Sequence, residues 1–336
     1  MLFVALGVIW GLPYLLIRVS VREVTPAFLV FVRTAGGAVL LAPFVLRRGA
    51  LRPLLPHWRA IVLFTVVEMG IPWWVLFTAE QKVTSSLAGL LVAAVPIAGA
   101  VIARVTGSDR LDRRRLSGLA LGIVGAAALV GFDVGRSSLL AASSFLLVVA
   151  GYAFGPWVLA RYLSGLPSAS VILASLVLAA VAYTPAAVVQ WPHRALSNSV
   201  LLSMAGLTVI CTAVAFTIFF ALIREVGPMR ATVITYVNPA VAVLLGVVVL
   251  GESFGWATVV GFVTVLGGSF LATRSLRAPS AGPPGAVPSA GLASTLPPAG
   301  PPEALGAATG LGSTVPAAGW PDATGAAGEN TAAASA

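Results

Sequence analysis

Charged residues are scarce in this sequence, in which Asp, Glu, Lys and Arg make up only 9% of 336 residues. Soluble domains contain about a quarter charged residues, so this composition excludes an ordinary soluble protein. The hydrophobic share of 58% and the mean hydropathy of +0.99 predict an integral membrane protein instead.

Residues that commonly carry enzyme or metal chemistry are also few. The single cysteine, Cys211, excludes an internal disulfide and a cysteine-based metal cluster. The two histidines, His57 and His193, lie in predicted loops far apart in the sequence. A G-x-x-x-x-G-K-[ST] phosphate-binding loop is absent, which excludes ATP-driven transport within this chain. We therefore expect no enzymatic activity, no metal and no cofactor.

The apolar sequence divides into ten segments that are candidate membrane spans. At about 1.5 Å per residue, helices near twenty residues match the roughly 30 Å hydrocarbon core of a bilayer. The sequence therefore predicts an all-α membrane protein with ten transmembrane helices. Their predicted bounds are 2–17, 27–46, 58–79, 84–104, 114–132, 138–160, 168–190, 198–222, 229–250 and 254–273.

The last part of the chain, residues 278–336, differs in composition from the rest. It contains no Lys or Arg and holds ten of the 23 prolines among Ala, Gly and Ser. Such a segment buries too little apolar surface to offset the entropy of ordering it. We predict a disordered C-terminal tail.

An internal repeat organises the chain up to the start of this tail. The two halves align without a gap in the register that places Pro13 on Pro156, Pro96 on Pro239 and Gly125 on Gly268. The predicted repeats are residues 1–134 and 135–277, with five spans each. Because five is odd, tandem copies must cross the membrane in opposite senses, which predicts inverted repeats of the kind found in carriers.

Arginine distribution predicts the orientation in the membrane. Fourteen basic residues lie in the gaps on the side of the two termini, against five on the other side. The positive-inside rule therefore places both termini in the cytoplasm. The net charge of +9 does not indicate nucleic-acid binding, because the arginines lie in short gaps between apolar segments. We expect a multi-pass protein of a bacterial cell membrane, in contact with the lipid bilayer.

Two ionisable residues lie inside predicted spans. Glu68 is near the middle of the third span, where an ionised acid facing lipid costs about 2.5–3.5 kcal/mol. Burial favours its neutral form, so Glu68 is a candidate for proton coupling or substrate binding, with a purely structural acid as the alternative. Arg33 in the second span is predicted at nearly the same depth and within reach of Glu68. The alternative for Arg33 is a side chain that extends to the outer surface.

Two tryptophans follow Glu68 by five and six residues. At about 100° per residue, this spacing turns Trp73 and Trp74 away from the Glu68 face of the helix. We predict that both belong to the aromatic belt at the outer interface, although a kink at Pro72 could redirect them.

Several short motifs resemble the EamA-type domain of the drug/metabolite transporter superfamily. They include Trp10-Gly11, Arg33, the run Thr84–Leu91 leading to Pro96, and Arg224–Pro228 followed by Pro239 and Gly251-Glu252. The resemblance covers residues 1–273. It implies a ten-helix carrier whose cavity is lined by the first, third and fourth helices of each repeat, in a family that exports amino acids, drugs and other metabolites.

The cavity and hinge candidates follow from this resemblance and from helical spacing. Trp10 and Tyr14 share one face of the first helix, and the resemblance places them on the cavity wall, with simple packing as the alternative. Thr232, Thr235 and Tyr236 form a polar stripe with Pro239 on the ninth helix, opposite a stripe of small residues on the fourth. Pro96 and Pro239 are expected in mid-helix, where they would act as paired hinges or merely permit bending.

Together these features predict a secondary-active transporter, which exports small organic molecules by alternating access and draws on proton exchange at Glu68. Two alternative functions remain. An integral-membrane enzyme would need clustered His, Asp or Lys at a membrane face. A non-transporting receptor or scaffold could use the tail to bind partners. The sequence does not specify the substrate or the oligomeric state.

Overall fold

The computed structural model describes residues 2–47, 51–106, 113–133, 136–226, 237–253 and 255–273. Within these ranges the chain is helical and contains no strand, in agreement with the predicted all-α fold. Residues 1–278 form one compact unit. The predicted tail, residues 278–336, lies outside the described residues.

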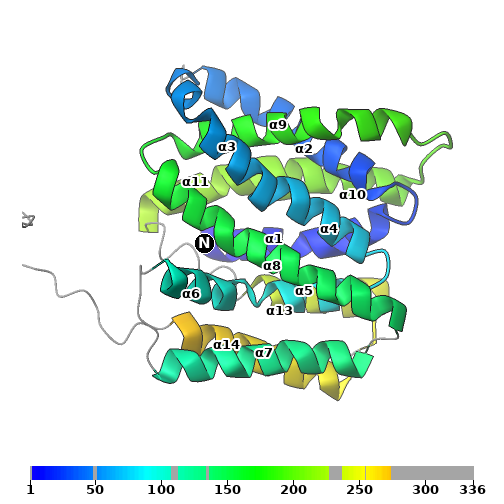
Figure 1. Ribbon diagram of the computed structural model, residues 1–336. Helices are drawn as coiled ribbons and strands as arrows, with labels where there is room; N and C mark the ends of the chain where they lie inside the picture. The colour runs from blue at the N-terminus through cyan, green and yellow to red at the C-terminus, as the bar shows by residue number, and fades with distance from the viewer. Residues whose placement is uncertain are drawn as a thin grey trace, which may run out of the picture. The chain divides into compact units, whose positions relative to one another are not determined.

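The first half of the chain contains five groups of helices, and the third and fourth groups are interrupted (Figure 1). The third group includes a π-helical segment, η2, and the fourth consists of two short helices. The bounds are α1 Leu2–Ser20, α2 Pro26–Leu46, η1 Arg52–His57, α3 Trp58–Phe64, η2 Thr65–Gly70, α4 Ile71–Ala79, α5 Ser85–Val92, α6 Val95–Val105 and α7 Arg113–Asp133.

The second half repeats this order. Its bounds are α8 Arg136–Tyr162, α9 Ser168–Val189, α10 Asn198–Thr208, η3 Val209–Val214, α11 Ala215–Val226, α13 Asn238–Leu250 and α14 Trp256–Thr273. The register of the sequence repeat moves α2 onto positions 169–189, which match α9 closely at both ends. The sequence repeat and the helix positions therefore agree.

A π-helical segment occurs at the same place in each half. In the register of the sequence repeat, η2 falls on positions 208–213, which overlap η3 along almost its whole length. In each segment a threonine hydroxyl donates to a backbone carbonyl, from Thr65 to Ile61 at 2.7 Å and from Thr212 to Leu207 at 2.9 Å. Because π-helix makes up well under 1% of residues in proteins, this matched pair supports the two-repeat organisation independently of the sequence alignment.

The last helices of the two halves, α7 and α14, lie side by side and run antiparallel (Figure 1). A Cβ built at Gly268 would lie 2.7 Å from the Gly122 Cα, and one built at Gly125 would lie 2.8 Å from the Thr264 Cβ. Residue numbers rise along one helix as they fall along the other, as inverted repeats require. Such close approach of backbones through glycine is typical of helix packing in membranes.

The other main contacts also join the two halves. Helix α2 packs on α9, α1 packs on α13, and α6 packs on α8. The first helix of each repeat therefore packs against the fourth span of the other. The interior of the molecule is built between the repeats and not within each one.

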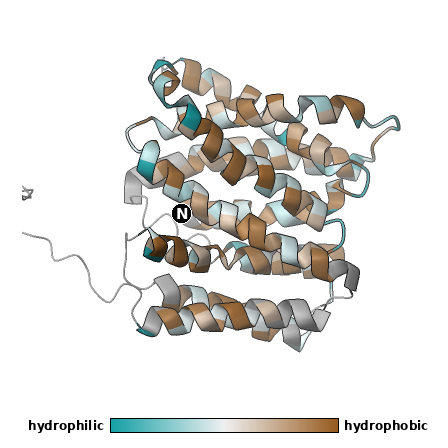
Figure 2. Cartoon of the chain, viewed as in Figure 1, coloured by the Kyte–Doolittle hydropathy of each residue, from teal (hydrophilic) through white to brown (hydrophobic). Residues whose placement is uncertain are grey.

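Six helical stretches are long and apolar enough to cross a membrane, and Figure 2 shows that many residues along the helices are hydrophobic. Four shorter apolar stretches, 4–20, 116–125, 238–250 and 258–271, occupy the places of the remaining predicted spans. The described chain is thus consistent with a multi-pass membrane protein. The count of ten crossings stays a prediction.

The two prolines predicted in mid-helix lie instead at the starts of helices. Helix α5 ends at Val92, and Pro96 is in the first turn of α6. Pro239 is likewise in the first turn of α13. A first-turn proline lacks only an amide hydrogen that the helix does not use, so it does not itself bend the helix.

The break between α5 and α6 leaves backbone groups that need partners. The Ser269 hydroxyl of α14 donates to the Ala93 carbonyl at 2.8 Å. The break in the fourth span is therefore held by a helix of the other repeat. The hinge role of Pro96 and Pro239 stays a prediction.

Candidate functional site

Arg33 of α2 lies at the junction of the two repeats, and its side chain is only 7% exposed. Its Nε donates to the Thr212 hydroxyl of η3 at 3.1 Å. The guanidinium carbon lies 3.8 Å from the centre of the Trp73 ring of α4, which is cation–π geometry. A cation of the first repeat is therefore held against the π-helical segment of the second.

The terminal nitrogens of Arg33 are less constrained. Within the described ranges they donate no hydrogen bond to the protein, and no carboxylate forms an ion pair with Arg33. The side chain does not extend to the outer surface, which was the alternative prediction. A buried guanidinium with unused donors can bind an anionic or carbonyl-bearing group.

Trp73 corrects the prediction of an aromatic belt. Its side chain is 5% exposed, whereas that of Trp74 is 45% exposed. Only Trp74 therefore has the exposure that a belt residue needs. The prediction assumed about 100° per residue from Glu68 to Trp73. Glu68 lies within η2, however, and the wider turn of this π-helical segment changes the angle between the two side chains. The sequence carried no signal of this π-helical segment.

One buried and one half-buried tyrosine complete the surroundings of Arg33. Tyr14 of α1 and Tyr152 of α8 both lie within electrostatic reach of the guanidinium. Tyr14 is 6% exposed and packs on Gly89 of α5, where a built Cβ would lie 3.6 Å from its ring. We call Arg33, Trp73, Tyr14, Tyr152 and Thr212 the central cluster. Only Arg33 and Tyr14 of these five were predicted.

Glu68 lies in η2 and faces α8 rather than Arg33. Its carboxylate occupies the space next to Gly155, and its Oε2 is buried without a hydrogen-bond partner in the described chain. The predicted contact between Arg33 and Glu68 is not formed. Tyr152 lies within electrostatic reach of both residues.

The remaining predicted cavity residues have different outcomes. Trp10 packs on two aromatic rings of α11, with centroid distances of 6.2 Å to Phe216 and 5.0 Å to Phe219. These ring contacts are packing interactions, and the place of Trp10 on a cavity wall stays a prediction. Thr232, Thr235 and Tyr236 lie outside the described residues.

A second group of charged residues lies where the connections α1–α2, α4–α5 and α13–α14 meet. Glu252 accepts hydrogen bonds from the backbone amides of Ser85 and Ser86 at 2.7 and 2.9 Å and from the Ser86 hydroxyl at 2.5 Å. It thereby caps the start of α5 from the other repeat. We call Arg18, Glu80, Ser85, Ser86 and Glu252 the Glu80 end.

Glu80 itself is fully buried, although it directly follows α4. Neither of its carboxylate oxygens has a hydrogen-bond partner in the described chain. The Arg18 guanidinium donates to the Glu80 backbone carbonyl and not to its carboxylate. The sequence analysis gave Glu80 no role, because its burial depends on contacts with distant segments.

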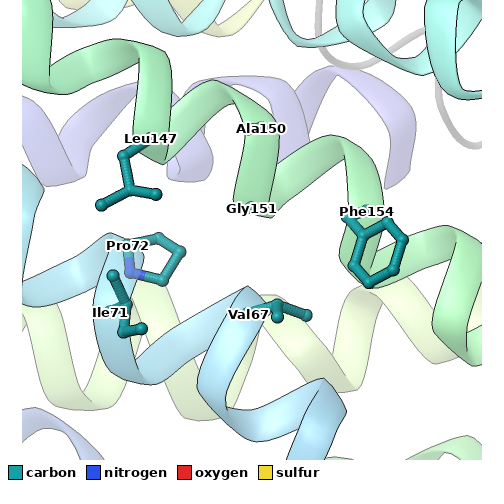
Figure 3. Close-up of a pocket in the computed structure, with 7 residues that line it drawn as sticks. All are labelled: Val67, Ile71, Pro72, Leu147, Ala150, Gly151 and Phe154. Atoms are coloured by element: carbon teal, nitrogen blue, oxygen red, sulfur yellow. The ribbon is translucent and has the colours of Figure 1, made fainter.

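A pocket of about 220 Å³ lies between α8 and the η2–α4 segment (Figure 3). Its lining consists of apolar residues and glycine: Val67, Ile71, Pro72, Leu147, Ala150, Gly151 and Phe154. Leu147 is 51% exposed and Ile71 is 42% exposed, so this pocket opens on the outer surface of the helices. It offers no polar side chain to a substrate and does not include the central cluster.

Comparison with known proteins gives consistent matches over both halves. The EamA-like transporter family matches residues 1–131 and again residues 139–274. The inner membrane transporter YedA of Escherichia coli K12, described as uncharacterized, is 30% identical over 256 residues, which cover 74% of this chain and 82% of YedA. A probable amino-acid metabolite efflux pump of Salmonella typhimurium is 22% identical over 288 residues, covering 80% of this chain and 93% of the pump.

A solved crystal structure has the same fold. It superposes with a TM-score of 0.60 at 18% sequence identity, and the match covers 81% of this chain and 95% of that chain. At this identity the likeness concerns the fold alone.

Proposed function

Because the chain belongs to the EamA-like transporter family, we propose that it is a secondary carrier that exports small organic metabolites across the bacterial inner membrane. The observation that carries the proposal is the position of the central cluster. Arg33 and Trp73 come from the first repeat, and Thr212 and Tyr152 from the second. A site assembled from both repeats changes its access when the repeats exchange conformations.

The chemistry of the cluster suits a small polar molecule with an apolar or aromatic part. Arg33 offers unused donors, and the tyrosines offer hydroxyl groups beside aromatic rings. The relative named a probable amino-acid metabolite efflux pump supports export of this type of compound. The arginine distribution supports cytoplasmic termini.

Proton exchange at Glu68 is the proposed driving reaction. Its buried, unpartnered Oε2 favours the neutral acid in the arrangement described here. Exposure of the same carboxylate to water would favour release of the proton. Tyr152, which interacts electrostatically with both Glu68 and Arg33, offers a route by which substrate at Arg33 influences Glu68.

Transport by the purified protein in liposomes tests this proposal. We expect pH-gradient-driven movement of at least one compound in a panel of amino acids, organic acids and drugs, and none in protein-free liposomes. Loss of that movement in Arg33→Met would assign it to the central cluster. Binding without transport for every compound would instead favour a receptor, and chemical conversion of a compound would favour an enzyme.

A further inference from the structure

Glu80 is a buried acid that the central cluster does not use. Its side chain has 0% exposure, and both carboxylate oxygens are enclosed without a hydrogen-bond partner in the described chain. An ionised carboxylate in such a place is strongly unfavourable, because it loses its water and accepts no hydrogen bond in the described chain. The arrangement therefore requires the neutral acid.

The titratable groups that face Glu80 come from four separate elements. Arg18 and Tyr14 are on α1, Arg33 is on α2, Tyr152 is on α8, and Glu252 follows α13. The two arginines attract a negative charge at Glu80, whereas Glu252 repels it. Three hydrogen bonds hold the Glu252 carboxylate at the start of α5, and none joins it to the Glu80 carboxylate in the described chain.

Arg18 shows why ionisation of Glu80 would alter this end of the molecule. In the enclosed arrangement its guanidinium is bound to the backbone carbonyl of Glu80. A negative Glu80 side chain would need either that guanidinium or water. Either change alters the surroundings of the Arg18 guanidinium, which joins α1 to the end of α4. A short connection joins the end of α4 to the serines that hold Glu252 of the other repeat.

We propose that Glu80 is a proton-binding site and that the Glu80 end of the carrier closes only when Glu80 holds a proton. A proton from the adjacent aqueous phase binds one carboxylate oxygen, and its return to that phase leaves the anion that opens the end. The predicted topology places this end on the outer face of the membrane. Acidification outside therefore closes the carrier toward that side. The inference rests on the proposed alternating access but does not require a known substrate.

The only cysteine of the chain provides the measurement. Cys211 of η3 is fully buried and lies within electrostatic reach of Arg33. Its rate of modification by a membrane-impermeant thiosulfonate, applied outside intact cells from pH 5.5 to 8.5, reports opening toward that side. Dividing the wild-type rate by the Glu80→Gln rate at each pH removes the pH dependence of the thiol itself.

We expect this ratio to rise with pH by up to about tenfold per pH unit, the limit for one coupled proton. Gln has the shape of the neutral acid, so Glu80→Gln should stay closed at every pH. Arg18→Met removes an attractive charge but keeps the Glu80 carboxylate. The rise of the modification rate with pH should therefore shift to higher pH in this variant. Glu23 is an exposed acid of the α1–α2 connection, and it accepts a hydrogen bond from Ser197 at the start of α10. Glu23→Gln should behave as wild type.

A ratio that does not change with pH, or absence of modification at every pH, would overturn the proposal. Modification after unfolding in detergent verifies that each variant carries a reactive thiol. Because the assay uses no substrate, its failure is distinct from a failure of liposome transport. A pH-dependent ratio in a protein that transports nothing would leave the Glu80 site standing and remove the carrier function.

Discussion

Gly155 of α8 leaves the space that the Glu68 carboxylate of η2 occupies. A Cβ built at Gly155 would lie 2.9 Å from the Glu68 Cδ and 3.0 Å from its Cβ. A real Cβ cannot approach that closely, so any side chain at position 155 must displace the acid or separate α8 from η2.

Gly155→Ala therefore tests the position of Glu68. We expect it to destabilise the protein by about 1–3 kcal/mol through overpacking. It should also reduce pH-gradient-driven transport. Thermal unfolding and liposome transport measure the two effects. Gly165→Ala is the matched control, because nothing lies within 4 Å of a Cβ at that position, and equal behaviour of the two variants would contradict the assigned packing.

Glu68→Gln tests proton coupling directly. Gln keeps the shape of the neutral acid but cannot titrate. We expect the variant to insert and bind substrate but to lose the dependence of transport on a pH gradient, while substrate counterflow survives. Wild-type pH-driven transport in Glu68→Gln would make Glu68 a structural acid, and loss of both binding and counterflow would make it a substrate ligand.

Arg33→Lys tests whether the planar guanidinium matters. Lysine keeps the charge but cannot both stack on Trp73 and donate to Thr212, so we expect transport to fall about 10- to 100-fold. The loss of stability should not exceed about 1–3 kcal/mol, the cost of one unmade buried hydrogen bond. Arg22→Lys, at an exposed position, is the control. A large loss of stability with normal transport would assign Arg33 a structural role.

Glu23 gives a prediction about stability and pH. Hydrogen bonds from the hydroxyl and backbone amide of Ser197 lower the pKa of Glu23 below its usual value of 4.5. The contribution of Glu23 to stability is present above pH 4.5 and is lost as the pH falls through the lowered pKa. The melting temperature of Glu23→Gln should therefore vary less with pH than that of wild type below pH 4.5, and parallel curves would contradict this.

Reporter fusions test the orientation. A reporter active only outside the cytoplasm should be inactive when fused after Arg277 and active when inserted between Asp133 and Arg136. The opposite pattern would reverse the predicted topology and place Glu80 at the cytoplasmic end.

The repeat was predictable because the same residue types recur in one constant register along the two halves. That single register anticipated the positions of α8 to α14 from those of α1 to α7. In the same register, Cys211 and Leu176 stand at the positions that match Glu68 and Arg33, so the repeats differ there. Apolar periodicity and proline positions were sufficient for this level of description.

The π-helical segments were not predictable, because the hydrogen-bond change that defines them has no distinct residue pattern. The error in placing Trp73 followed from this. Tyr152 and Glu80 were missed for another reason. Their surroundings depend on α1, α8 and the α13–α14 connection, which only the folded chain brings together.

The antiparallel contact of α7 and α14 is close to self-complementary, so two identical five-helix proteins inserted in opposite directions could form it. Such a homodimer would present every functional residue twice. It would place two arginines and two glutamates around one axis, with repulsion between like charges. Joining the copies in one chain removes that constraint. A single chain can therefore carry one arginine, Arg33, and one glutamate, Glu68. Leu176 and Cys211 stand at the matching positions of the second half.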